Sequence, residues 1–286
     1  MKYRTHVPSG KAQSMLLRIS ALALSTLALS SSAQIVTLAD QNSLAQINTG
    51  TQQGMFNWSV DGQNQLVKQW FWYRVGSLGP ESSIDTLLLP LNTVVDPRTL
   101  DSAYFNPTLG YGVDIRYHLT GNLPGSGSSV IGEAITITNG TANSIVFHFY
   151  QYSDFNLSGP GGDKVTLIRG VDGKFKEAQQ VNATTSLSES LDATLVTHAD
   201  HGAATNSPVT LNQLNDGLPT TLQDTTSFGP GDATWAFEWD LTIGAGQSTI
   251  LSKNLSLQVP EPGSAGLICL GALGAVFGWR RARRNG

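Results

Sequence analysis

The tightest group of metal-capable side chains in the sequence is the segment His198-Ala199-Asp200-His201. Two imidazoles and a carboxylate in one short segment can bind a transition metal. A structural zinc site, however, closes with four ligands and often includes cysteine, and the single cysteine, Cys269, lies in an apolar C-terminal run. The composition therefore favours a solvated loop here, and we assign no metal ligands.

Several oxygen-rich turns are candidates for calcium, because Ca²⁺ prefers oxygen ligands. The ligand spacing of an EF-hand is absent, and turn propensity alone accounts for Asx-Gly pairs. We therefore expect no cofactor, and calcium as a stabiliser is the alternative that remains open. The turns in question are Asp154-Phe155-Asn156, Asp172-Gly173, Asn215-Asp216-Gly217 and Gly231-Asp232.

The sequence lacks the settings in which catalytic nucleophiles are usually found. Neither G-x-S-x-G nor H-E-x-x-H occurs. Glu133, Glu238 and Asp240 fall on expected strands, where outward-facing acids on a half-solvated sheet are ordinary. We therefore assign no catalytic residue and expect a non-enzymatic protein. A hydrolase with two carboxylates stays the less favoured alternative, since the separation of such a pair depends on the fold.

Trp70 and Trp72 are the candidates for a binding surface. In the run KQWFWYR, a period of two places both on the face that also carries Lys68 and Arg74. Exposed indole rings can stack against sugar rings, which predicts possible glycan stacking at this face. The alternative is that the opposing sheet covers one face of the strand and a loop covers the other.

The elements that position these residues are strands. Apolar and polar residues alternate over 113–119, as in a half-buried strand, and clusters of Gly, Pro and Asn separate such runs. Only 38–47 is a candidate helix. We therefore predict an all-β ectodomain, an antiparallel β-sandwich or jelly-roll-like fold. The other expected strands are 55–60, 66–75, 84–89, 130–138, 144–152, 164–169, 175–181, 194–198, 235–241 and 249–259.

The part of the chain between its two terminal segments is strongly acidic. Residues 34–258 contain 9 of the 17 Lys and Arg and 20 of the 21 Asp and Glu, which gives a formal charge of −11. Phosphate binding needs clustered basic residues, so we expect no nucleic acid as a partner. The length suffices for one hydrophobic core without disulfides.

The N-terminus has the three parts of a secretory signal peptide. Four basic residues precede an uncharged run at 19–29, and Ser31-Ser32-Ala33 then provides small residues for a signal peptidase. We therefore expect residues 1–33 to be removed and the mature chain to begin near Gln34.

The C-terminus has an apolar run of fifteen residues, 265–279, followed at once by arginines. This is short for a membrane span, and flanking positive charge favours the cytoplasmic side. We expect a transmembrane helix with its basic end inside. The residues concerned are Ala265, Leu267, Ile268, Leu270, Leu273, Val276, Phe277 and Trp279 in the span, and Arg280, Arg281, Arg283 and Arg284 in the cytoplasmic anchor.

The motif Pro260-Glu261-Pro262, the apolar run and the arginine-rich end together resemble the PEP-CTERM sorting signal of Gram-negative bacteria, over residues 259–286. This tail is also labelled an ice-binding protein C-terminal domain. The resemblance implies processing by an exosortase and export to the envelope or the exopolysaccharide matrix. The runs WFWYRVG and FHFYQYSDFNL also resemble uncharacterised exported proteins with this tail, which implies no chemistry.

We therefore predict an exported, surface-directed, non-enzymatic β-sandwich protein, anchored first in the inner membrane and then at the envelope, the outer surface or outside the cell. Its expected partners are signal peptidase, an exosortase, the membrane before processing, and exopolysaccharide. A cell-surface carbohydrate-binding module that uses Trp70 and Trp72 is the main alternative, and a secreted hydrolase is less favoured.

Overall fold

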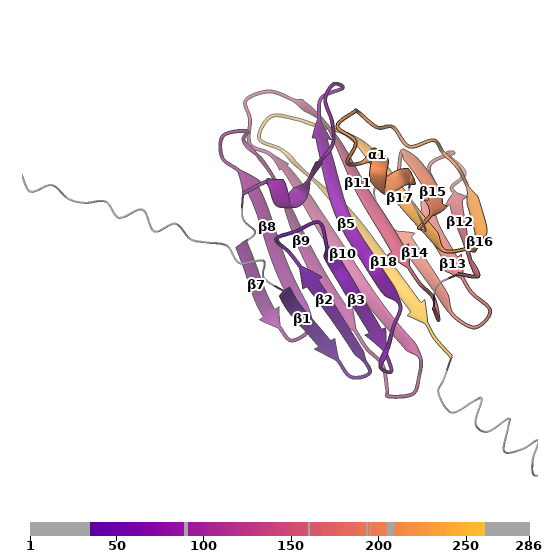
Figure 1. The fold of residues 1–286 in the computed structure, drawn as a ribbon. Coiled ribbons are helices and arrows are strands. Elements are labelled where there is room, and N and C mark those ends of the chain that lie inside the picture. Colours follow the sequence, from indigo (N-terminus) through magenta and orange to yellow (C-terminus); the bar gives the residue numbers. More distant parts are fainter. Residues whose placement is uncertain are drawn as a thin grey trace, which may run out of the picture. The chain divides into compact units, whose positions relative to one another are not determined.

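The computed structural model describes residues 35–88, 91–159, 161–192, 194, 196–204 and 209–260. These residues form two nine-stranded sheets, called sheet A and sheet B, in which every strand pairing is antiparallel. The strands of the two sheets run in roughly the same direction, one sheet behind the other (Figure 1). The prediction of an all-β antiparallel sandwich is confirmed.

Sheet A is the sheet that carries the candidate site. Its strands lie in the order β1 (Ile35–Asp40), β2 (Ser43–Asn48), β3 (Gly54–Val60), β5 (Leu66–Val75), β11 (Ile145–Phe155), β17 (Ala233–Ile243) and β15 (His198–Ala203), with the short strands β4 (Gln63–Asn64) and β6 (Ser82–Ser83) paired to β3 and β5.

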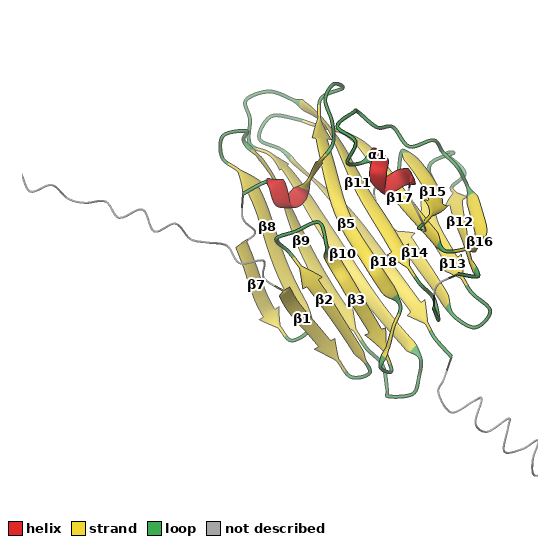
Figure 2. Cartoon of the chain, viewed as in Figure 1, coloured by secondary structure: helices red, strands yellow, loops and turns green. Residues whose placement is uncertain are grey.

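Sheet B forms the other layer. Its strands lie in the order β16 (Ser227–Gly231), β12 (Asp163–Arg169), β13 (Phe175–Val181), β14 (Ser186–Leu191), β18 (Ser248–Gln258), β10 (Ser128–Asn139), β9 (Tyr111–Thr120), β8 (Thr99–Asn106) and β7 (Leu91–Asp96). In the described chain, helix is limited to the 3₁₀ turn η1 (Ile84–Thr86) and to α1 (Val209–Gln213), both short (Figure 2).

The core lies between the sheets and is rich in aromatic rings. On β11, Phe147 and Phe149 point inward and stack on Tyr73 and Phe71 of β5, with ring centroids 5.8 Å and 5.5 Å apart. Tyr111 of sheet B meets Tyr73 edge to face at 5.8 Å, which joins the two layers. Offset and edge-to-face pairs of this kind are the favoured arrangements of aromatic rings.

The centre of sheet A is buried on both faces, which distinguishes it from an ordinary half-solvated sheet. Residues Gln69 to Arg74 of β5 and Phe149 to Ser153 of β11 are all buried, although neighbours along a strand point to opposite faces. One face packs on sheet B. A segment at 209–225, called the strap, covers part of the other face, and α1 lies within it (Figure 1).

Three expected elements differ from the structure. The strand expected at 194–198 begins only at its last residue, His198. Residues 38–47, the candidate helix, belong to the hairpin of β1 and β2, in which Gln41 takes a positive φ of 48°. Residues 84–89 were expected as a strand, but the 3₁₀ turn η1 begins at Ile84.

The expected signal peptide, 1–33, and the expected membrane helix, 265–279, lie outside the described residues. Within the described part of the chain, every helix is too short and too polar to cross a bilayer.

Candidate functional site

The outer face of sheet A gathers ionisable side chains from four neighbouring strands. His148 of β11 is paired in register with Arg74 of β5 on one side and with Asp240 of β17 on the other. Residues two apart on a strand share a face, so Tyr150 and Glu238 follow on the same side as His148 and Asp240. The β15 residue His198 is paired with Glu238. Four strands thus place one polar cluster on this face.

The strap closes the inner part of this cluster through its backbone. Arg74 Nη2 and the Tyr150 hydroxyl both donate to the carbonyl oxygen of Thr220, at 3.1 Å and 2.8 Å. In the opposite sense, Thr220 N donates to Glu81 Oε1 at 2.9 Å, and Leu222 N donates to Glu238 Oε2 at 2.8 Å. These four hydrogen bonds satisfy the side chains of the cluster and the backbone groups of the strap at the same time.

The covered groups form a buried ion cluster. Arg74 Nε lies 2.9 Å from Glu81 Oε1 and Arg74 Nη2 lies 4.0 Å from Glu238 Oε1, and the three side chains are 5%, 0% and 0% exposed. The single proton of the Tyr150 hydroxyl is shared between Thr220 O and Glu238 Oε1, which lies 3.0 Å away. Burial raises the pKa of Tyr150, and the Glu238 carboxylate raises it further. A buried charge is tolerated only when it is paired and hydrogen-bonded, as these are.

The outer part of the cluster, called the rim site, is His148, His198, Glu238 and Asp240. His148 Nδ1 is bonded to Asp240 Oδ1 and lies 3.5 Å from Glu238 Oε1. His198 Nε2 lies 3.5 Å from Asp240 Oδ2, and its Nδ1 lies 3.1 Å from Asp224 Oδ1 in the strap. His148, His198 and Asp240 are 14%, 29% and 32% exposed, so the rim site is open to solvent at one side.

The two carboxylates keep His148 charged. Its hydrogen bonds to Asp240 and then to Glu238 raise the pKa of His148 from 6.5 to about 9, against the effect of burial and of Arg74. The same hydrogen bond lowers the pKa of Asp240. At neutral pH the rim site therefore holds a protonated His148 between two carboxylates. The imidazolium can donate a proton and the carboxylates can accept one.

We expect the stability of the protein to fall as pH rises because of His148. Its pKa is higher in the folded chain than in the unfolded chain, so its stabilisation is complete below about pH 6.5 and is lost through pH 9. Urea unfolding between pH 6 and pH 9.5 measures this. His148→Gln should flatten the profile in this range, whereas His118→Gln on β9 should retain it. If the free energy of unfolding of His148→Gln falls with pH as steeply as that of the wild type, another group is responsible.

A second polar cluster lies inside the sandwich and was not expected. Lys253 of β18 is fully buried, and its Nζ lies 2.5 Å from Glu133 Oε2 and 3.2 Å from Glu189 Oε1. Gln151 of sheet A donates to Glu189 Oε2 at 2.8 Å. Gln69, oriented to satisfy its neighbours, donates to Glu133 Oε1 at 2.9 Å and accepts from Lys253 at 3.0 Å. Burial raises the pKa of Glu133. This cluster is closed to ligands and joins the two sheets.

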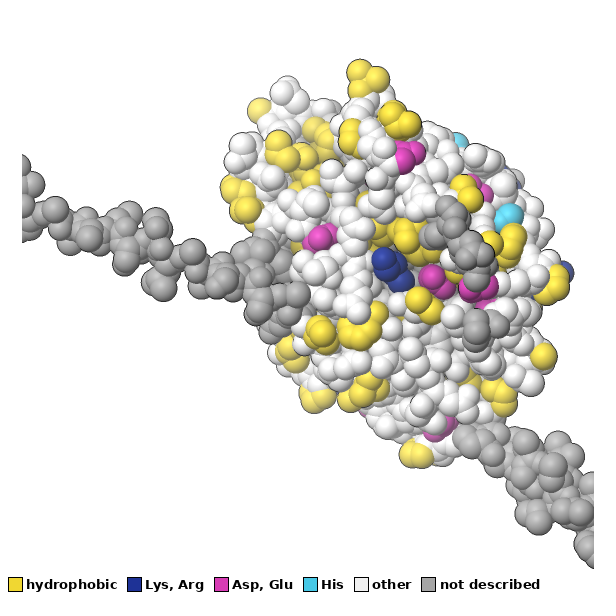
Figure 3. All heavy atoms as spheres, in the orientation of Figure 1, with side chains coloured by type: hydrophobic (Ala, Val, Ile, Leu, Met, Phe, Trp, Pro, Cys, Tyr) yellow, Lys and Arg dark blue, Asp and Glu magenta, His cyan; other side chains and the backbone are white. Residues whose placement is uncertain are grey.

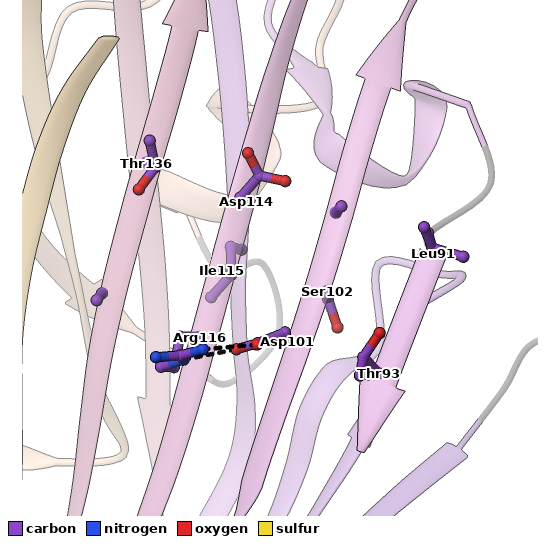
Figure 4. A pocket seen from close by; sticks show the side chains of 10 residues that line it. Leu91, Thr93, Asp101, Ser102, Asp114, Ile115, Arg116 and Thr136 are labelled. Atoms are coloured by element: carbon purple, nitrogen blue, oxygen red, sulfur yellow. Dashed lines mark hydrogen bonds and ion pairs between the residues drawn. The ribbon is translucent and has the colours of Figure 1, made fainter. Parts of the chain in front are cut away.

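The outer surface of sheet B carries a shallow groove of about 360 Å³ over β7 to β10 (Figure 4). Asp101 and Arg116 face one another across it in a two-bond ion pair, both bonds 2.7 Å long. Asp114 and Thr136 line the same groove, and burial followed by the Asp101 charge raises the pKa of Asp114. The groove offers polar groups on an open surface.

The structure corrects the prediction of glycan stacking at Trp70 and Trp72. Both side chains are 0% exposed. Trp70 Nε1 donates to Ser83 Oγ at 2.8 Å, and Trp72 Nε1 donates to the strap residue Asn215 at 3.3 Å. The two rings therefore have no face available to a sugar, because chain segments cover them, as the alternative interpretation of this strand supposed.

The segment His198-Ala199-Asp200-His201 forms β15 and is not a solvated loop. Only its first histidine reaches the rim site. Asp200 bonds to Thr225, and the ring of His201 packs on Phe228 with centroids 5.5 Å apart. These residues are adjacent in the sequence, but alternation along a strand directs their side chains to different neighbours.

Two of the oxygen-rich turns, those with Asp154 and Asp232, come near one another on the outer face of sheet A, at the end of the strands opposite the rim site. Burial, followed by the charge of Asp232, raises the pKa of Asp154 to about 7, and Lys68 opposes this rise. Acidic side chains and a Lys or Arg side chain lie close together on this face (Figure 3). The two carboxylates thus belong to one electrostatic group that Lys68 partly neutralises.

Sequence reasoning missed Glu81, Tyr150 and the strap. Glu81 bonds to Arg74 seven residues away and to Thr220 across the sheet, and the apolar-polar pattern contains no sign of either contact. Tyr150 was expected on a strand, at 144–152, but its buried hydroxyl could be recognised only once the covering segment was known.

Comparisons with solved structures show a shared fold. A galactose mutarotase related enzyme from Lactobacillus acidophilus matches with a TM-score of 0.54 at 6% identity, over 80% of this chain and 99% of that one. A bacterial glucoamylase complexed with acarbose matches with a TM-score of 0.51 at 9% identity, over 85% of this chain. The chain spans only 36% of that glucoamylase. No curated protein sequence matches the chain.

The tail of the chain matches a protein-family model. The family model of the PEP-CTERM protein-sorting motif matches residues 258–284. The last strand, β18, ends at Gln258, so the match begins where the sandwich ends. Residues 258–284 of this chain are a PEP-CTERM protein-sorting motif.

Proposed function

We propose that the chain is an exported, non-enzymatic β-sandwich protein that an exosortase-type enzyme processes at its tail, and that the sandwich then serves in the cell envelope or exopolysaccharide matrix. The observation that carries this proposal is the PEP-CTERM motif at residues 258–284. The motif implies processing by a transpeptidase-like enzyme. Such an enzyme releases or transfers the part of the chain before the motif, which here contains the whole sandwich.

The junction between sandwich and motif supports processing without unfolding. Val259 is 2% exposed, and its backbone N donates to Gly127 O at 2.7 Å, so the chain is fixed up to this point. The next residue, Pro260, is exposed. A processing enzyme that acts near Pro260-Glu261-Pro262 can therefore reach its substrate while the fold stays intact.

The strap supports the non-enzymatic part of the proposal. Arg74, Glu81 and Glu238 are the covered charged groups of the outer face, and each bonds to a backbone group of the strap. A catalytic acid, base or anion-binding group needs a free position that faces its substrate. These three groups are instead used to hold a covering segment.

Changing the motif should block processing. With Pro260, Glu261 and Pro262 all replaced by alanine, we expect the protein in its native host to keep its tail and to stay in the membrane fraction. The intact mass of the protein from each cell fraction measures this. The exposed-proline variant Pro107→Ala should be processed as wild type. Removal of the tail from the triple variant as from the wild type would contradict the proposal.

A carbohydrate-binding module is the second candidate. The groove over β7 to β10 favours it, because Asp101, Asp114 and Thr136 offer acceptors and donors for sugar hydroxyls on an open surface. The fold neighbours described above are a galactose mutarotase related enzyme and a glucoamylase with bound acarbose. Glycan-array binding that Asp114→Ala abolishes and His148→Gln leaves unchanged would favour this candidate.

A further inference from the structure

The rim site has the residue types and the spacing of a metal centre. His148, Glu238 and Asp240 each present a ligand atom, and these atoms all lie within 4.8 Å of one another. His198 adds a second imidazole nitrogen 3.5 Å from Asp240 Oδ2. We propose that the rim site binds one divalent transition-metal ion of the Zn²⁺ type, with His148, His198, Glu238 and Asp240 as ligands.

Two of the observed separations match those of a tetrahedral ion. Zinc lies about 2.0–2.2 Å from nitrogen and oxygen ligands, so two ligands of a tetrahedron are about 3.4 Å apart. His148 Nδ1 lies 3.5 Å from Glu238 Oε1, and His198 Nε2 lies 3.5 Å from Asp240 Oδ2. His148 Nδ1 and Asp240 Oδ1 are hydrogen-bonded to one another, so these two atoms must move apart as the ion replaces the proton between them.

Neighbouring groups already orient two of the ligands. His198 Nδ1 lies 3.1 Å from Asp224 Oδ1, which directs its Nε2 toward Asp240. A carboxylate behind a histidine is the usual support of a metal-binding imidazole. On the other side, Leu222 N holds Glu238 Oε2 at 2.8 Å, and Oε1, which also meets the Tyr150 hydroxyl, lies toward His148. His148 faces both carboxylates through Nδ1.

The charge of the surroundings also calls for a cation. The connected network contains four carboxylates, Glu81, Asp224, Glu238 and Asp240, and two guanidinium groups, Arg74 and Arg169. A metal ion that binds His148 displaces the proton that this imidazole carries at neutral pH. With both imidazoles neutral in the metal-bound state, the side chains of the network carry a net charge of −2, which one divalent ion cancels. His198 and Asp240 are about one-third exposed, so an ion can enter from solvent.

The residue types select the kind of ion. Calcium and magnesium prefer sites made of oxygen ligands alone, whereas imidazole nitrogen suits zinc, copper, nickel and iron. The two histidines of the rim site therefore favour Zn²⁺ over Ca²⁺. This is a different place from the oxygen-rich turns around Asp154 and Asp232.

Zinc titration of the full chain tests the proposal. The chain is purified in mild detergent, stripped with EDTA, and titrated with Zn²⁺ by calorimetry and with Co²⁺ by visible absorption. We expect one Zn²⁺ per chain and a tetrahedral Co²⁺ spectrum. Asp240→Asn and His198→Gln should each weaken Zn²⁺ binding at least about 10-fold. The matched controls Asp101→Asn and His118→Gln, both on sheet B, should bind as wild type.

Far-UV circular dichroism of each variant confirms that the fold is kept, and His198, at the partly exposed edge of the site, is the ligand whose replacement should disturb the core least. The proposal is overturned if the stripped wild-type chain takes up no Zn²⁺ at micromolar concentration. It is overturned equally if folded Asp240→Asn and His198→Gln bind Zn²⁺ with wild-type affinity. A Co²⁺ spectrum of octahedral type, or one that His118→Gln alters, also contradicts it.

Discussion

Replacing Lys253 with methionine should lower the free energy of unfolding by about 3–5 kcal/mol, the largest effect of a single change that we expect. Lys253 is fully buried and is paired with both Glu133 and Glu189. Methionine has a similar volume, so the packing changes little. The loss arises because two carboxylates then remain between the sheets without a positive charge.

Urea unfolding followed by tryptophan fluorescence measures this loss. Lys164→Met, at an exposed position of β12, is the matched control and should change little. Adding Glu133→Gln and Glu189→Gln to Lys253→Met should restore most of the stability, since it removes the unpaired charges. If Lys253→Met alone is as stable as the wild type, the buried cluster does not bind the sheets together as described.

Replacing Arg74 with methionine should release the strap and lower the free energy of unfolding by about 3 kcal/mol. Arg74 pairs with Glu81 and donates to the Thr220 carbonyl and to Tyr150. Without it, Glu81 and Glu238 are buried with no guanidinium beside them. We expect water to enter under the strap, since that is the cheapest way to solvate two carboxylates.

Hydrogen exchange shows where the structure loosens. Amides of the strap, among them Thr220 and Leu222, should lose protection in Arg74→Met, while β9 and β10 of sheet B keep theirs. Arg116→Met removes an exposed arginine–carboxylate pair and should leave the strap protected, because solvent screens such pairs. Uniform loss of protection over both sheets would show that Arg74 supports the whole fold and not the strap in particular.

Much of the fold could be predicted because most strands have one buried face. The expected strands at 130–138 and 175–181 fall on β10 and β13, where buried residues alternate with more exposed ones. Several other strands were missed. On β7 and β16 most residues are exposed or half-buried, so they give no alternation. Residues 38–47 were assigned to the wrong element because apolar residues in a short hairpin can imitate helical spacing.

The candidate site could be predicted only in part. The sequence placed Glu133, Glu238 and Asp240 on strands, but it suggested that all three face solvent. Glu133 instead points between the sheets toward Lys253, and Glu238 lies under the strap. Which face of a strand is covered depends on segments distant in the chain. Lys253 lies 120 residues beyond Glu133, and no local pattern links the two.

The residues of the rim site could also be predicted only in part. The sequence drew attention to four neighbouring residues with a histidine at each end, yet only His198 takes part. Its partners come from β11 and β17, and β-sheet register alone brings them together. Composition can indicate that metal-capable residues exist, but the fold decides which of them meet.

The intact mass of the protein isolated from its native host tests the central claim most directly. The account predicts a protein outside the cytoplasm that lacks residues 1–33 and most of the segment beyond Pro262, with the sandwich folded. A full-length chain recovered from the cytosol, with both terminal segments still attached, would contradict it.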